Sequence, residues 1–277
     1  MISQRFKNAL VDTFLVGMVA LVLIFFYVPI VTLVVFSFTD SRVLTLPIEG
    51  ISFGWYGELL RKPDFLSALT NSALVAAVST VFATVLGTAG AIAWMRYRFR
   101  FQQIFRAVTF APLLFPQLLL GVVMLLWFSV LGQWFGFSTG LPTVIIGHIV
   151  YITPFALVII AVQVYGFDET LEDAARDAGA NGWEVFREVT FPLLWPGIFS
   201  AATFAFLLSW GNFYVSYSLA GTARTLPTFV YSGIAVGSSP IYPALATLNF
   251  VPALALVVLA DIIRRRALKR QRLAIPA

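Results

Sequence analysis

The chain has 277 residues, of which 60% are hydrophobic and only 11% are charged, and its formal net charge is +5. A soluble domain is about 25% charged, so this composition excludes a water-soluble protein and places the chain in a lipid bilayer, where a basic excess marks the flanks of membrane spans and not a nucleic-acid partner. The lack of cysteine excludes disulfides and thiolate metal sites, and the single histidine, His148, leaves little material for a zinc or catalytic site.

Six apolar stretches are long enough to cross a membrane, since a spanning helix needs about 20 mostly apolar residues. The predicted spans cover residues 13–39, 67–95, 107–131, 141–167, 193–219 and 240–260. The first follows basic residues as a secretory signal does, but it is too long and lacks a cleavage site, so we expect it to be retained. We therefore expect an all-α integral membrane protein that forms one transmembrane domain over residues 1–277.

The distribution of lysine and arginine predicts the orientation of these spans. Fourteen of these residues fall in the terminal segments and in the loops after the second and fourth spans, whereas four fall on the opposite side. Loops rich in lysine and arginine stay in the cytoplasm. We therefore expect both termini to be cytoplasmic.

The loop after the fourth span, residues 168–192, is acidic, and we call it the acidic loop. Five acids and one arginine precede Gly179. We expect Asp168 to cap a short helix whose first turn is acidic, and Gly179 to end that helix in a left-handed conformation. The helical spacing gives this segment one small apolar face, made of Leu171, Ala174, Ala175 and Ala178.

A second short helix is expected to follow in the acidic loop. Asn181 and Glu184 have the spacing of a capping box, and Pro192 is expected to end this helix. A helix lying on the membrane surface would carry a basic polar face, whereas this loop is acidic and would be repelled by anionic lipids. The alanine-rich face instead favours close packing against a protein partner.

The acidic loop resembles the EAA loop of binding-protein-dependent ABC importer permeases, whose pattern is E-A-A, three residues, G, nine residues, I, any residue, L-P. Every spacing is kept: Ala174, Ala175, Gly179 and Pro192 match, and Asp173, Val189 and Phe191 replace Glu, Ile and Leu. Segments 65–72, 111–121 and 225–227 are also similar to this family, in its spermidine/putrescine branch.

The resemblance implies the type I ABC importer permease fold in a bacterial inner membrane. It implies ABC ATPase subunits as partners, a second permease that is usually a different chain, and an external binding protein. The implied solute is small: polyamine-like, amino-acid-derived or related. The residues expected to couple to the ATPase are Glu172, Asp173, Ala174, Ala175, Gly179, Val189, Phe191 and Pro192. Because no GxxxxGK[ST] sequence is present, ATP and magnesium are expected on the partner ATPase, with no cofactor in this chain and no enzymatic activity of its own.

The fifth predicted span is the most polar. If it were one continuous helix, Ser209, Asn212 and Ser216 would form a stripe flanked by aromatic rings. Two interpretations stay open, a substrate path or contacts between helices. The candidate path residues are Ser209, Trp210, Asn212, Tyr214 and Ser216.

One departure concerns the solute. Relatives in the polyamine branch often carry an acidic pair where this chain has Gly211 and Asn212, so the fifth span offers no carboxylates to a cationic solute. We expect His148, inside the fourth span, to pack as a lone histidine against another helix.

Two other functions would suit six kinked spans: a secondary transporter and a membrane assembly protein without transport activity. The first would be expected to carry ionisable groups within its spans, of which this chain has almost none. The second gives no reason for the acidic loop.

Overall fold

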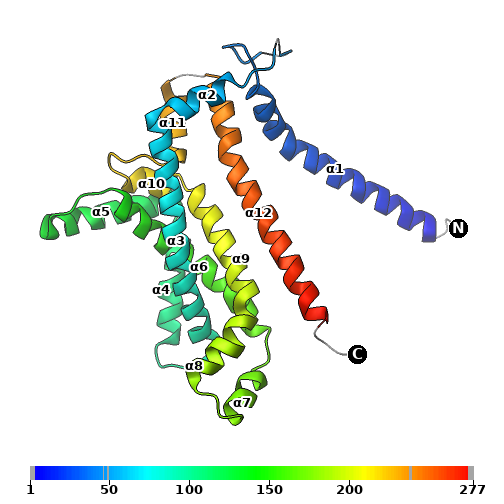
Figure 1. The fold of residues 1–277 in the computed structure, drawn as a ribbon, viewed down its shortest axis with the longest axis vertical. Helices are drawn as coiled ribbons and strands as arrows, with labels where there is room; N and C mark the ends of the chain where they lie inside the picture. The colour runs from blue at the N-terminus through cyan, green and yellow to red at the C-terminus, as the bar shows by residue number, and fades with distance from the viewer. Residues whose placement is uncertain (1–3, 46, 49, 237–238, 274–277) are drawn as a thin grey trace. The chain divides into compact units, whose positions relative to one another are not determined.

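A computed structural model of the chain describes residues 4–45, 47–48, 50–236 and 239–273 (Figure 1). Apart from one isolated β-bridge between Thr39 and Ile51, the regular structure in these residues is helical. The first helices are α1 (Gln4–Phe36), α2 (Gly54–Arg61), α3 (Pro63–Arg96), α4 (Gln102–Leu114), α5 (Gln117–Phe135) and α6 (Leu141–Tyr165). They are followed by α7 (Thr170–Asp177), α8 (Gly182–Val185), the π-helix η1 (Phe186–Thr190), α9 (Phe191–Trp210), α10 (Tyr214–Leu219), α11 (Leu226–Val236) and α12 (Ile241–Leu273).

The described residues contain six helical segments that are long and apolar enough to cross a membrane, which confirms the predicted number. They are Val11–Phe36, Pro63–Arg96, Gln117–Phe135, Leu141–Tyr165, Gly182–Trp210 and Ile241–Leu259. The third differs from the predicted 107–131 because the helix breaks at Phe115, whose backbone is extended. Phe115 precedes Pro116, and a residue before proline is disfavoured in the helical conformation.

The chain divides into two compact units, described here separately. The first comprises residues 1–62 and 232–251, and the second comprises residues 63–231 and 252–277. In the first unit, the indole of Trp55 donates a hydrogen bond of 2.7 Å to the carbonyl of Thr39, and the hydroxyl of Tyr56 donates one of 2.7 Å to Ser37. These contacts attach α2 to the segment that follows α1.

The core of the second unit is a bundle in which α3 packs along α6 and α9 (Figure 1). Small residues set the spacing: a Cβ atom added at Gly87 of α3 would lie 2.8 Å from the Cβ of Ala156 of α6. Membrane helices associate through such close contacts because lipid removes the hydrophobic drive between them. Leu157, Ile160 and Leu194 are buried beside this contact, so one end of the bundle is tightly packed next to the acidic loop.

Candidate functional site

The first helix of the acidic loop, α7, has well-defined ends. The N-cap position is Glu169 and not the predicted Asp168. Asp168, one residue earlier, still accepts a hydrogen bond of 3.0 Å from the backbone N–H of Thr170, and this bond lowers the pKa of Asp168. At the other end Gly179 has a φ of +92°, as predicted. The N–H of Ala180 donates to the carbonyl of Ala175, and that of Gly179 donates to Arg176, the pair of bonds that defines a Schellman motif.

The second helix, α8, begins with the predicted capping box. The side-chain oxygen of Asn181 accepts hydrogen bonds from the N–H groups of Trp183 and Glu184, at 3.0 and 3.1 Å, and the Glu184 carboxylate accepts one of 2.7 Å from the N–H of Asn181. Three backbone N–H groups at this helix start are thus satisfied within four residues. Local contacts therefore define the turn between α7 and α8.

The prediction that Pro192 ends the second helix is wrong. Pro192 is the second residue of α9, and the helical run continues from Gly182 to Trp210. A proline in a helix loses its N–H bond and its ring meets the carbonyl four residues back. The π-helical turn η1 precedes it here, and its extra residue per turn moves those carbonyls.

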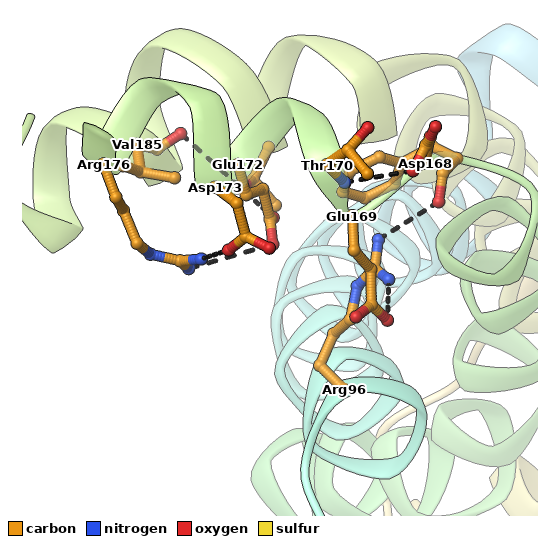
Figure 2. Close-up of polar contacts among 10 residues, drawn as sticks. Arg96, Asp168, Glu169, Thr170, Glu172, Asp173, Arg176 and Val185 are labelled. Carbon is orange, nitrogen blue, oxygen red and sulfur yellow. Dashed lines mark hydrogen bonds and ion pairs between the residues drawn. The ribbon is translucent and has the colours of Figure 1, made fainter. Parts of the chain in front are cut away.

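Polar contacts within α7 and from α7 to η1 involve Glu172, Asp173 and Arg176 (Figure 2). The side chain of Glu172 is only 12% exposed, and its carboxylate accepts a hydrogen bond of 2.5 Å from the hydroxyl of Thr190 in η1. Arg176 donates to Asp173 at 2.7 Å and lies 3.9 Å from Glu172. The bond between Glu172 and Thr190 therefore fixes α7 against η1, whereas the ion pairs of Arg176 lie within α7.

A further contact joins the acidic loop to α3. Arg96, the last residue of α3, forms an ion pair with Glu169 and donates a hydrogen bond of 3.3 Å to the carbonyl of Phe167 (Figure 2). Its guanidinium lies 4.2 Å from the centre of the Phe167 ring. Sequence reasoning assigned Arg96 to the charge bias alone. Its partners lie about 70 residues away in the sequence, so no local sequence pattern could predict these contacts.

The outward side of α7 and α8 is open. Leu171, Ala174 and Ala178 are exposed, and Ala175 is half-buried, so the described residues leave most of the predicted apolar face uncovered. The indole of Trp183 is 68% exposed and stacks on the ring of Phe186. Among the other residues predicted to couple, Asp173, Gly179, Phe191 and Pro192 are exposed, and Val189 is half-buried.

The fifth span is not the continuous helix that the predicted polar stripe required. Helix α9 ends at Trp210, and α10 starts at Tyr214. Asn212 lies in the break, is buried, and accepts a hydrogen bond of 3.1 Å from the N–H of Val215. Its amide therefore caps α10. The predicted polar stripe assumes an unbroken helix, so it could not predict that Asn212 caps a second helix.

Ser209 and Ser216 lie on either side of this break and meet at one side chain. Nδ1 of His148 lies 2.7 Å from the Ser209 hydroxyl, and Nε2 lies 3.0 Å from the Ser216 hydroxyl. His148 is 1% exposed, as expected of a histidine packed between helices. Of the five candidate path residues, Ser209, Trp210, Asn212 and Ser216 are buried in this chain, and Tyr214 is 46% exposed.

Comparison with known sequences places these features in context. The family described as "Binding-protein-dependent transport system inner membrane component" matches residues 83–273. The putrescine transport system permease protein PotI of Escherichia coli K12 is 36% identical over 228 residues, which cover 81% of each chain. The spermidine/putrescine transport system permease protein PotC of the same organism is 31% identical over 250 residues, covering 90% of this chain and 93% of PotC.

Solved structures share the fold. A chain of a bacterial ABC transporter involved in the import of the acidic polysaccharide alginate superposes with a TM-score of 0.72 at 18% identity, covering 94% of this chain and 96% of that one. A chain of the MetNI methionine ABC transporter in an inward-facing conformation gives 0.62 at 20% identity, covering 78% of this chain and 99% of that one. The fold is thus that of the membrane subunits of ABC importers.

Proposed function

The chain belongs to the family of binding-protein-dependent transport system inner membrane components, and on this premise we propose that its acidic loop is the docking site of a separate ABC ATPase. The protein is a multi-pass inner-membrane permease subunit of an ABC importer and not itself an enzyme. Family membership sets aside the secondary transporter and the assembly protein.

One observation carries the docking proposal: α7 is fixed from its inner side while its alanine face is left open. The polar contacts of Glu172 and the ion pair of Glu169 point into the chain. Leu171 and Ala174 point out of it, with Trp183 exposed on the next helix. A rigid helix with a narrow apolar face fits a groove of a protein partner. We call α7 the coupling helix from here on.

The wider assembly follows from the same proposal. ATP and magnesium bind to the ATPase, a second permease (a different chain) completes the translocation path, and an external binding protein delivers the solute. Both termini and the coupling helix face the cytoplasm, which the bias of fourteen against four basic residues supports. Both compact units belong to one transmembrane domain over residues 1–277.

For the solute we propose a small organic cation, with putrescine and spermidine as the first to be tested. The names of PotI and PotC support this choice. The predicted fifth span, residues 193–219, lacks carboxylates, but aromatic rings gather at and after its break. The half-buried Phe213 lies 5.2 Å from the exposed Tyr217 and 4.9 Å from the exposed Tyr231, centre to centre, beside Tyr214. Ring faces attract ammonium groups. In this proposal Tyr214 faces the path, and Ser209, Trp210, Asn212 and Ser216 support the break.

Copurification tests the docking proposal. The affinity-tagged chain is expressed with the ATPase subunit encoded beside it, and the recovered ATPase is measured. Ala174→Arg places a long charged side chain on the open face and is expected to abolish recovery of the ATPase, whereas Arg98→Glu, an equally large change at an exposed site outside the loop, is expected to leave it intact. Recovery that Ala174→Arg does not affect would rule out docking on this face.

A further inference from the structure

Arg96, the last residue of α3, differs from the next three arginines of the chain in where its charge lies. Arg98, Arg100 and Arg106 are exposed, whereas the side chain of Arg96 is 12% exposed. An arginine at the end of a membrane helix ordinarily extends its charge into water or the headgroups. A charge bias for orientation would be met equally well by an exposed side chain, so the inward position of Arg96 requires another explanation.

Its three contacts all fall on the short link between α6 and α7 (Figure 2). The guanidinium pairs with the Glu169 carboxylate, donates 3.3 Å to the carbonyl of Phe167, and lies 4.2 Å from the centre of the Phe167 ring. A planar guanidinium that bonds through two nitrogens and stacks through its face is fixed in direction as well as position. The end of α3 is thereby attached to the start of the coupling helix.

Packing around this attachment is incomplete. A polar cavity of about 210 Å³ lies between the end of α3 and the acidic loop. Its lining includes Ile92, Arg96, Glu169, Glu172, Arg176 and Thr190. Where side chains do not fill the space, van der Waals contact cannot carry a displacement from one element to the other. The bonds of Arg96 cross this gap to α3, as the bond between Glu172 and Thr190 does to η1.

We infer that Arg96 is a positioning residue that makes α3 follow the coupling helix when the ATPase moves it. This rests on the proposed docking of an ATPase on α7. Both Arg96 and its partner Glu169 lie outside the segment from Asp173 to Pro192 that resembles the EAA loop. The residues that receive the ATPase and those that pass its movement to α3 are therefore different sets.

The chain contains no cysteine, so two engineered cysteines can carry spin labels that report on α3 and α7. Val85→Cys on α3 and Asp177→Cys at the end of α7 are both exposed sites. The distance between the labels is measured in the reconstituted transporter, assembled with cysteine-free partner subunits, without nucleotide and with ATP plus orthovanadate. ATPase recovery is measured first on the same sample.

In the labelled protein that keeps Arg96, and in the control Arg98→Ala, ATP plus vanadate is expected to leave the distance between the labels unchanged. In Arg96→Ala the same treatment is expected to shift or broaden that distance. Glu169→Ala, a change at an exposed carboxylate, is expected to give the same shift, and the double variant no more. If Arg96→Ala does not accumulate, Glu169→Ala decides by the same criterion. An unchanged distance in the variants, or an equal shift in the Arg96 protein, overturns the inference. Absence of the ATPase from the unmodified sample would instead count against the docking proposal.

Discussion

The hydroxyl of Thr190 lies 2.5 Å from the carboxylate of Glu172 and joins the π-helical turn η1 to the coupling helix. Both partners are largely buried, Thr190 being 7% exposed. A hydrogen bond to a charged group contributes about 1.5–3 kcal/mol. The bond is therefore a principal support of the loop that meets the ATPase.

Thr190→Val removes this donor with little change in shape. We expect the coupling helix to open more readily, so that its backbone amides exchange about 10- to 100-fold faster, in line with the energy of the bond. Hydrogen exchange of α7 in the purified protein measures this. Thr190→Ser keeps the hydroxyl and is expected to retain protection; equal loss of protection in the serine variant would show that the methyl group, and not the bond, matters.

Gly179 and Gly182 form a matched pair for testing backbone conformation. A Cβ atom at either position meets no atom within 4 Å, but only Gly179 has a positive φ. A left-handed conformation costs a non-glycine residue about 1–2 kcal/mol. Gly179→Ala is therefore expected to weaken ATPase binding about 5- to 30-fold, and Gly182→Ala to leave it unchanged. Titration of the ATPase against the purified chain measures both, and equal weakening would refute a conformational cause.

His148 is expected to stabilise the chain through its two serine contacts. Hydrogen bonds between membrane helices contribute about 0.6 kcal/mol on average and up to about 1.7, so Ser209→Ala and Ser216→Ala should each lower the free energy of unfolding by an amount in this range, and His148→Leu by more. Ser200→Ala is the control, because the Ser200 hydroxyl donates to the carbonyl of Pro196 in its own helix. Unfolding in detergent measures the series; an equal cost for the control would contradict the expectation.

Variants at Asn212 distinguish a role in capping α10 from a role in contacting the solute. Asn212→Ser and Asn212→Asp keep an oxygen that accepts from the N–H of Val215, whereas Asn212→Leu does not. Loss of a cap costs about 0.5–2 kcal/mol, so only the leucine variant is expected to be less stable. Uptake of labelled putrescine is measured beside unfolding. If Asn212→Ser unfolds normally but loses uptake, the amide contacts the solute and the cap alone is not its role.

The proposed orientation is tested with single cysteines in this cysteine-free chain. Arg98→Cys is expected to react with a membrane-impermeant maleimide in inside-out vesicles and not in spheroplasts. Ile51→Cys, 81% exposed, is expected to show the opposite pattern. Both variants are scored for assembly by recovery of the ATPase. A reversal of the two patterns would invert the topology and place the acidic loop outside the cell.

Features with local causes were predictable from the sequence. The six spans follow from the length of the apolar runs. The capping box at Asn181 and the left-handed Gly179 each depend on residues within five positions of one another. The backbone conformation from the coupling helix to the start of α8 is therefore predictable from the local sequence alone.

Features that depend on distant residues were not predictable in this way. The ion pair of Arg96 with Glu169 requires that α3 and α6 end at the same level, which is set by packing along the whole length of both helices. The break after Trp210 is stabilised by His148, 61 residues from Ser209. The prediction that Pro192 ends a helix fails because the rule for proline assumes α-helical hydrogen bonds, whereas the π-turn before it has a different bonding pattern.

The unbroken run from Gly182 to Trp210 has a mechanical consequence. At a rise of 1.5 Å per residue its 29 residues form a lever about 44 Å long, longer than the hydrocarbon core is thick. One end of this run lies beside the coupling helix, and the other end reaches the break at Gly211. A tilt imposed at the loop would be delivered at the far end as a sideways swing, to a point where the backbone is already interrupted.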